Sequence, residues 1–281
     1  MDESILYEMP FVDSVVLVTD FSKASEKAFA HALAIALIRQ TRFVILHAGS
    51  NKCEWTHYPA VRRTLENWGY LEAGSDRSAI FERLKMRVEK VMVKGQPLPA
   101  TMKYLSKHPT DLIVLSMYKR SKFLHWLRPS LAESIQAESS TKTLFVPDKG
   151  RGIVSLESGQ MRIKRILVPV DERPNPLAAL EYAARVANIT GHAVEIVLLH
   201  VGDLVESFEG NLPEGPSVKW RKVVRHGDVV SEILQAANDW QIDMIMMTTA
   251  RHTGVLGALR GSVTREVLHR SPCPLLAIPS H

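Results

Sequence analysis

Four residues near the C-terminus of the chain have the types and order of a phosphate-binding turn. Gly261, Ser262, Val263 and Thr264 open an amphipathic stretch, 262–270, that is predicted to be a helix. The first N–H groups of a helix have no partner within it, and the helix dipole adds positive charge there, so phosphate oxygens are favoured ligands. Arg251, in the preceding loop, can add a full positive charge. These residue types indicate anion binding.

An aspartate stands directly after a predicted strand of the same half. Asp171 follows the apolar run "ILVPV", and its carboxylate can accept hydrogen bonds from a ribose or from the edge of an adenine. Ligands of open α/β sheets bind beyond the carboxyl ends of the strands, which is where this residue falls. A second interpretation stays open, in which Ser262 is only a helix N-cap and Asp171 only caps the helix that follows it.

The chain contains two related halves, so these residues have counterparts. Asp20 and Asp171 end matching segments 151 positions apart, whereas Asp111 and Asp243 match at a spacing of 132. "RFVILHAGS" likewise matches "VEIVLLHVGD", and the histidine in each is interpreted as a core residue. Several matching blocks in the same order indicate a duplication, and the smaller spacing means that the second half lacks about 20 residues.

Apolar runs alternate with stretches of helical periodicity in both halves. This order predicts an α/β fold of two tandem doubly wound domains, each with a five-stranded parallel sheet. The predicted strands are 14–19, 43–48, 88–94, 111–117, 143–147, 164–170, 193–201, 218–226, 242–248 and 274–279. The predicted helices are 23–39, 76–87, 97–107, 130–138, 176–189, 229–240 and 262–270. We predict domains at 1–149 and 161–281, with a linker at 150–160 that is rich in Gly, Ser and charge.

Composition limits the function classes. The formal net charge of +5 is too small to argue for nucleic-acid binding, and the five tryptophans are scattered. The sequence has no apolar run long enough to span a membrane, and its two cysteines, Cys53 and Cys273, lie far apart. Its acidic N-terminal stretch leads us to expect no signal peptide. We therefore expect a cytoplasmic protein without membrane or nucleic-acid partners. No nucleophile–base motif, nucleotide-binding glycine motif or metal-ligand spacing occurs, so we expect a binding protein rather than an enzyme.

The sequence resembles the universal stress proteins, in the form with two domains in one chain. The resemblance covers nearly the whole chain and depends on "ILVPVD", "VLLHV" and, most specifically, "GSVTREVLHRSPCPLLAIP". It implies a Rossmann-like fold similar to that of the adenine nucleotide alpha hydrolases, with ATP, accompanied by Mg, bound at the crevice in one subgroup. It also implies that the last strands of the two domains, "TLFVP" and "LLAIP", pair with each other in an internal pseudo-dimer.

The resemblance assigns nucleotide-site positions in the second domain. They are Pro169, Val170, Asp171, Val201, Met247, Thr248, Arg251, Gly261, Ser262, Val263 and Thr264. Thr248 and Arg251 stand where the ATP-binding subgroup has two glycines. Because these side chains are larger than glycine, the backbone can approach a phosphate less closely. In the first domain Pro129 replaces the loop glycine and removes an N–H, so no ATP is expected there.

The resulting hypothesis is a stress-response protein that binds or senses an adenine nucleotide through its second domain. The alternative is a ligand-free interaction scaffold or a chaperone-like protein, with the basic and aromatic stretch "SMYKRSKFLHWLRPS" as a candidate surface for an unidentified protein partner. Slow ATP hydrolysis or autophosphorylation, which some relatives carry out, and a homodimer both stay open.

Overall fold

The computed structural model describes residues 12–49, 55–117, 134–135, 138–203, 212–249 and 263–280. The chain divides into two compact units, one made of Met1–Ser116 with Val154–Met161 and the other of Met117–Ile153 with Arg162–His281. This division places residues 117–149 with the second half. The predicted boundaries at 149 and 161 stay predictions.

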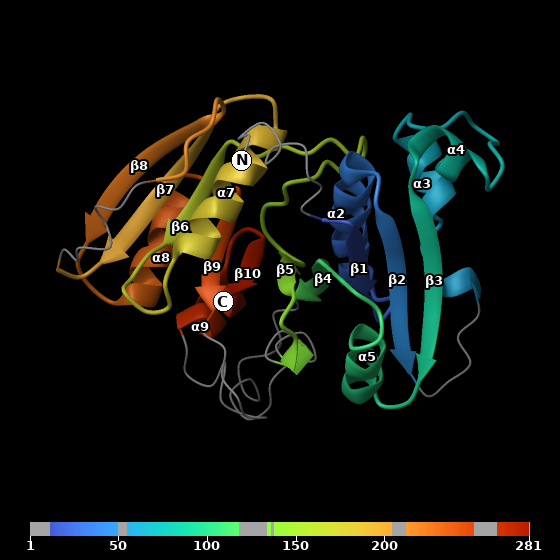
Figure 1. The fold of residues 1–281 in the computed structure, drawn as a ribbon, viewed down its shortest axis with the longest axis horizontal. Helices are drawn as coiled ribbons and strands as arrows, with labels where there is room; N and C mark the ends of the chain where they lie inside the picture. Colours follow the sequence, from blue (N-terminus) through green and yellow to red (C-terminus); the bar gives the residue numbers. More distant parts are fainter. Residues whose placement is uncertain are drawn as a thin grey trace, which may run out of the picture. The chain divides into compact units, whose positions relative to one another are not determined.

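The first unit is a parallel sheet with helices on both faces (Figure 1). Its strands are β1 (Ser14–Val18), β2 (Arg42–Gly49), β3 (Arg87–Lys94) and β4 (Leu112–Met117), in the order β3-β2-β1-β4. Its longer helices are α2 (Lys23–Arg39) and α5 (Pro97–Leu105). Phe29 of α2 packs near Phe43 on one face of the sheet, and Tyr104 of α5 bonds Arg42 on the other. These contacts confirm the doubly wound arrangement.

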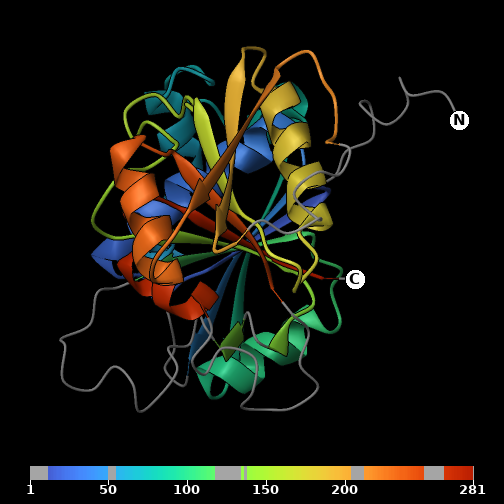
Figure 2. The same cartoon turned by 90° about the vertical axis from the view of Figure 1, so that its left-hand side faces the viewer.

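The second unit repeats this plan. Its strands are β5 (Lys142–Pro147), β6 (Arg165–Pro169), β7 (Val194–Val201), β8 (Val218–Arg225), β9 (Met244–Thr249) and β10 (Leu275–Pro279). The order β10-β9-β6-β7-β8 is parallel throughout. Figure 2 shows α7 (Leu177–Ile189) on one face and α8 (Val229–Asp239) and α9 (Val263–Arg270) on the other. The predicted five-stranded parallel sheet of this half is confirmed.

The last strands of the two halves pair as predicted. β5 runs antiparallel to β10, with Phe145 opposite Leu275 and Thr143 opposite Ala277. Leu144, Phe145, Leu275 and Leu276 are all buried, so this pairing covers apolar side chains as well as two strand edges.

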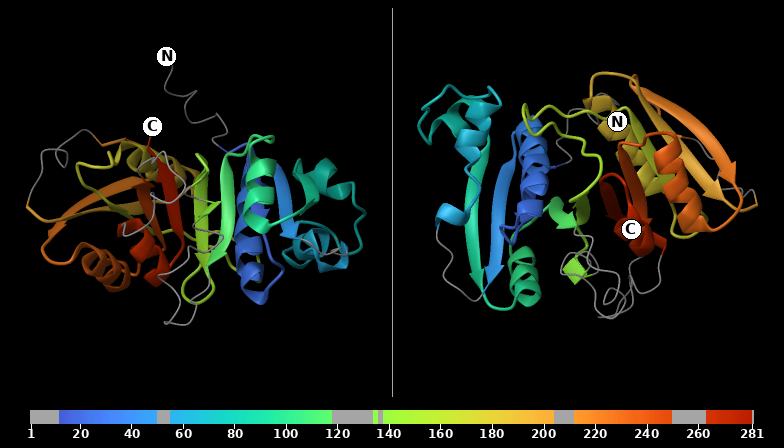
Figure 3. Two further views of the ribbon diagram at one scale, coloured as in Figure 1. Left: turned by 90° about the horizontal axis from the view of Figure 1, so that it is seen from below. Right: turned by 180° about the vertical axis from the view of Figure 1, so that it is seen from behind.

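An insert before β3 contains two short helices, α3 (Val61–Asn67) and α4 (Ala79–Leu84), and a 3₁₀ turn at Trp55–His57. Figure 3 shows α3 and α4 near the amino-terminal end of β3. The prediction of a helix over 76–87 was too long. Asp76 accepts from the N–H groups of Ser78 and Ala79 and so starts the helix later, and Lys85 ends it in a left-handed conformation, φ +54°. The helix α3 was missed, although Val61, Leu65 and Trp68 have helical spacing.

An aspartate in each half fixes the start of the first strand. Oδ2 of Asp111 accepts from the N–H groups of Asp13 and Ser14 at 3.0 and 2.9 Å. Oδ2 of Asp243 accepts from those of Lys164 and Arg165 at 2.7 and 2.9 Å. The two aspartates that aligned in sequence therefore have the same structural role, at the amino-terminal ends of the parallel strands.

Residues 154–161 form a small hairpin on the first unit. Val154 and Met161 make an antiparallel bridge, and the indole N–H of Trp68 donates to the carbonyl oxygen of Leu156 at 2.9 Å. Gly159, φ +68°, passes so close to the Trp68 ring that an added Cβ would lie 2.2 Å from it. Within the described residues, no helix combines the length and apolarity that a membrane span requires.

Candidate functional site

The carboxyl ends of three neighbouring parallel strands form the candidate site in the second unit. β6 lies between β7 and β9, with Pro169 opposite Leu199 and Leu167 opposite Ile245. Because the strands are parallel, the residues that follow β6, β7 and β9 emerge at one edge of the sheet. This edge brings together the predicted residues Pro169, Val170, Asp171, Val201, Met247 and Thr248.

A buried histidine holds the backbone just before Asp171. Nδ1 of His200 lies 3.1 Å from the carbonyl oxygen of Val170, and Nε2 lies 2.7 Å from that of Asp203. The Val170 N–H also donates to the Leu199 carbonyl at 2.9 Å. With its side chain 3% exposed, His200 is a core residue, as predicted, that also fixes the end of β6.

The carboxylate of Asp171 is exposed and only lightly engaged. Oδ1 accepts from the N–H of Glu172 at 2.8 Å, and the described residues provide no further hydrogen bond to this side chain. Asp171 does not cap α7, because Asn175 accepts from the N–H of Leu177 there. The capping alternative considered for Asp171 is therefore not what the structure contains, and the carboxylate can accept from a ligand.

Thr248 presents a buried hydroxyl near the end of β9. Its side chain is 7% exposed, and Oγ1 has no hydrogen-bond partner within the described part of the chain. An unpaired buried hydroxyl costs free energy, so a partner at this position would be favourable. Met247 is also buried but points to the opposite face of the sheet, because side chains alternate along a strand.

Of the remaining predicted positions, the structure describes only Val263 and Thr264, in the first turn of α9. Val263 is the first residue of this helix and is 37% exposed, whereas Thr264 is buried. Arg251, Gly261 and Ser262 lie outside the described residues, as does most of the stretch 116–130, including Pro129. The described helix, Val263–Arg270, lies within the predicted range 262–270.

The corresponding edge of the first unit is occupied by its own side chains. Oδ1 of Asp20 accepts from the hydroxyls of Ser22 and Ser25 at 2.6 and 2.7 Å, and from the Ser22 N–H at 3.0 Å. Phe21 stacks on His47 with ring centroids 4.4 Å apart. The carboxylate equivalent to Asp171 is thus bonded internally, beside an aromatic pair, whereas Glu172 stands at the position equivalent to Phe21 in the second unit.

In both halves, a histidine ring contacts the backbone carbonyl oxygen of the residue that precedes the aspartate. Nδ1 of His47 lies 2.8 Å from the carbonyl oxygen of Thr19, and Nδ1 of His200 makes the equivalent contact with Val170.

Among the described residues, no group of three or more His, Cys, Asp or Glu side chains is placed to hold a metal ion. Burial raises the pKa of the Cys273 thiol to about 11, so this cysteine is protonated and inert at neutral pH.

Comparisons with known proteins identify the family. The family model described as the universal stress protein family matches residues 12–147 and 209–279. A universal stress protein of Methanothermobacter thermautotrophicus is 40% identical over 63 residues, which cover 22% of this chain and 42% of the relative. The match thus spans less than half of that relative's length.

Solved structures of low sequence identity share the fold. The crystal structure of a universal stress protein from Archaeoglobus fulgidus is 18% identical, with a TM-score of 0.64, over 96% of this chain and 99% of the other. A structure from Pseudomonas aeruginosa UCBPP-PA14, described as belonging to the same family, is 14% identical, with a TM-score of 0.61, over 95% and 93%. Since the family model covers more than half of the sequence, the chain belongs to the universal stress protein family.

Proposed function

We propose that the second unit binds an adenine nucleotide at the edge formed by the ends of β6, β7 and β9. The observation that supports this most is the difference between the two aspartates. Asp171 is exposed with one backbone hydrogen bond among the described residues, whereas Asp20 is held by Ser22 and Ser25. A carboxylate with free acceptor capacity suits the hydroxyls of a ribose or an adenine N–H.

Two further features support a nucleotide at this edge. The buried, unpartnered Oγ1 of Thr248 offers a hydroxyl that a ligand can satisfy. The start of α9, at Val263, supplies N–H groups and a positive dipole end to phosphate oxygens, as in other nucleotide sites. In this proposal Gly261, Ser262 and Thr264 bind phosphate, Arg251 adds charge, and Mg accompanies the nucleotide through its phosphates.

The protein would act as a cytoplasmic binding or sensing component of a stress response rather than as a fast catalyst. Binding alone needs no nucleophile or base, and the side chains assigned here, Asp171 and Thr248, serve as hydrogen-bond partners. The first unit, whose Asp20 is engaged internally, would have a structural or partner-binding role.

The test is calorimetric titration of the full chain with ATP and Mg, after any carried-over nucleotide is removed. A site of about 10 μM dissociation constant stabilises the fold by about 2.7 kcal/mol at about 1 mM free ATP, 100 times that constant, so thermal unfolding gives a second readout. Asp171→Asn should weaken binding about tenfold or more, because it removes the charged acceptor. The matched Asp20→Asn variant should bind ATP like the wild type.

A second variant tests the phosphate end. Gly261→Pro places in the second half the residue that the first half has at Pro129, and it removes one N–H. It should abolish binding while the unfolding transition stays cooperative. Retained affinity would show that the nucleotide lies elsewhere, and no binding by the wild type at millimolar ATP would favour the ligand-free scaffold.

A further inference from the structure

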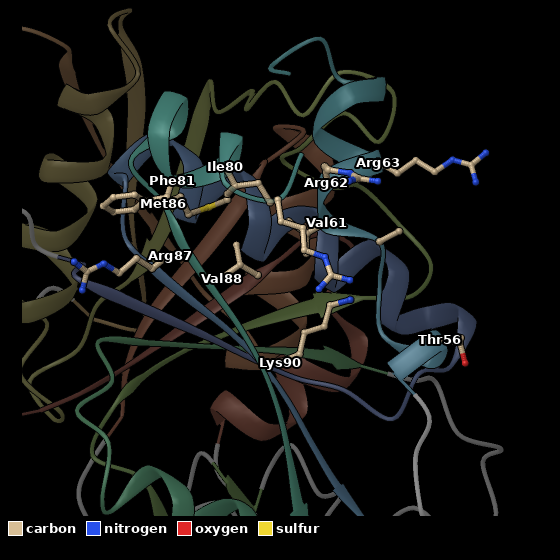
Figure 4. Close-up of a pocket in the computed structure, with 12 residues that line it drawn as sticks. Thr56, Val61, Arg62, Arg63, Ile80, Phe81, Met86, Arg87, Val88 and Lys90 are labelled. Carbon is tan, nitrogen blue, oxygen red and sulfur yellow. The ribbon is translucent and has the colours of Figure 1, made fainter. Parts of the chain in front are cut away.

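The insert of the first unit borders a large open pocket that the sequence did not predict. Its volume is about 1300 Å³, and it lies between α3, α4 and the first half of β3 (Figure 4). Its lining includes Arg77, Ile80, Phe81, Met86, Val88 and Lys90. This pocket belongs to the first unit alone and is separate from the candidate nucleotide site.

Apolar side chains form much of the wall. Val61 and Met86 are buried, Ile80 and Val88 are half-buried, and Phe81 is 49% exposed although it is a large aromatic residue. In Figure 4 these side chains come from α3, α4 and β3, except for Met86, which lies in the short link between α4 and β3. A wall of this kind favours contact with an apolar part of a ligand, because covering it removes apolar surface from water.

The alternation of β3 places a lysine in this apolar setting. Val88 and Lys90 share one face of the strand, and Glu89 points to the other, where it pairs with Arg42 at 2.8 Å. Lys90 Nζ lies 5.7 Å from the ring centroid of Tyr58. The carboxylate adjacent to Lys90 in sequence is therefore not available to it.

Two of the cationic side chains at the pocket have no carboxylate partner among the described residues. Burial, and secondly the positive charge of Arg77, lower the pKa of Lys90. Neither Lys90 nor Arg77 forms an ion pair with a described carboxylate. The acidic side chains nearby have other partners, which are Arg62 for Glu66, Arg83 for Glu72 and the Ser78 hydroxyl for Asp76.

We infer that this pocket binds an amphiphilic anion, with its anionic headgroup between Lys90 and Arg77 and its apolar chain against Ile80, Phe81, Met86 and Val88. Lys90 is half-buried and Arg77 is exposed, and one anion between these two like charges stabilises both. Arg63 and Arg87 extend away from Lys90 in Figure 4, so they would meet the headgroup less directly. The apolar wall explains why a simple inorganic anion would be a poor ligand.

The probe is n-decyl phosphate, titrated calorimetrically into the full chain below its critical micelle concentration. Lys90→Ala and Arg77→Ala should each weaken binding about tenfold, the effect of losing one charge-assisted contact. Arg83→Ala is the matched control, since this arginine lies on α4 but pairs with Glu72 outside the pocket, and it should leave the affinity unchanged.

Four further ligands test the contributions of the headgroup and the alkyl chain separately. n-Octyl phosphate should bind more weakly by about fourfold for each methylene removed from contact, and decanol and inorganic phosphate should each bind at least about tenfold more weakly than decyl phosphate. Decanoate distinguishes a carboxylate from a phosphate headgroup, and saturable binding of either agrees with the inference.

Two results would overturn the inference. One is the absence of saturable binding of both decyl phosphate and decanoate. The other is an unchanged affinity in Lys90→Ala and Arg77→Ala proteins whose cooperative unfolding shows that they are folded. Neither result depends on whether ATP binds to the second unit, because Asp171→Asn should bind decyl phosphate like the wild type.

Discussion

His200 and Val170 are joined by a contact of 3.1 Å between a ring nitrogen and a carbonyl oxygen, and His47 and Thr19 repeat it at 2.8 Å in the other half. Both contacts fix the backbone of the residue before an aspartate, Asp171 or Asp20. The two halves thus retain one backbone geometry while the side chains around each carboxylate differ. The shared histidine contacts thus stabilise the fold, whereas the differing side chains around the two carboxylates determine which ligand can bind.

Replacing the histidine should therefore affect stability and binding together. His200→Ala removes the ring N–H that one of the two facing carbonyls, Val170 or Asp203, accepts and leaves a cavity, so we expect a loss of about 1–3 kcal/mol in the free energy of unfolding. Urea denaturation measures this loss. His226→Ala is the control, because His226 is exposed, and a wild-type stability for His200→Ala would contradict the assigned role.

The two strand-start aspartates offer a comparison within one chain. Asp243→Ala should lower the free energy of unfolding by about 1–3 kcal/mol, because two backbone N–H groups lose a charged acceptor. Asp111→Ala should cost more, since Oδ2 of Asp111 also accepts from the Ser14 hydroxyl at 3.1 Å. Denaturation curves of the two variants check the order, and a larger loss for Asp243→Ala would refute this reasoning.

His31 should make the fold sensitive to mild acid. It is fully buried in α2, and burial lowers its pKa from 6.5 to about 4. Below pH 6.5 the unfolded chain takes up a proton that the folded chain does not bind until about pH 4, so stability falls as the pH falls through this window. At about 1.4 kcal/mol for each pH unit between the two pKa values, the loss is of the order of 3 kcal/mol.

The measurement compares the wild type with His31→Gln by urea denaturation at pH 7 and at pH 4.5. Both proteins lose stability as carboxylates are protonated, but the loss should be smaller in the variant, which has no titrating group at this position. His226→Gln should behave like the wild type. An equal loss in all three proteins would mean that His31 does not contribute.

Cys273 should resist thiol reagents as long as the protein is folded. The side chain is fully buried, and its pKa of about 11 leaves almost no thiolate at pH 8. In the Cys53→Ser variant, where Cys273 is the remaining cysteine, an aromatic disulfide reagent should react slowly in buffer and rapidly in urea. Reaction in buffer at the rate of an exposed thiol would contradict the burial.

Most strands were predictable because their residues are buried on both faces and form continuous apolar runs, as in β1 and β9. Their carboxyl ends, and hence the position of Asp171, follow from the same pattern. The helix α3 was missed because it is short and only Val61 and Leu65 within it are buried. The limits of α4 depend on a side-chain bond of Asp76 and on a left-handed Lys85, neither of which periodicity reveals.

The sequence could not predict which of the two carboxylates, Asp20 or Asp171, is hydrogen-bonded to neighbouring side chains. The two halves are similar up to Asp20 and Asp171, and only the positions of the hydroxyls of Ser22 and Ser25 show that the first aspartate is engaged. The pocket around Lys90 was missed for a similar reason. Arg77 and Lys90 are separated in sequence by a helix and a turn, and only the folded insert brings their charges together.

The hairpin at 154–161 bears on where this protein can be cut. Synthesis that stops at residue 149, at the end of the compositional first half, would omit Leu156 and Gly159 and leave the indole of Trp68 without its cover and its acceptor. It would also leave β5 without its antiparallel neighbour β10. The hairpin belongs to the first unit and β5 to the second, so a cut at residue 149 separates each of these segments from residues that it contacts.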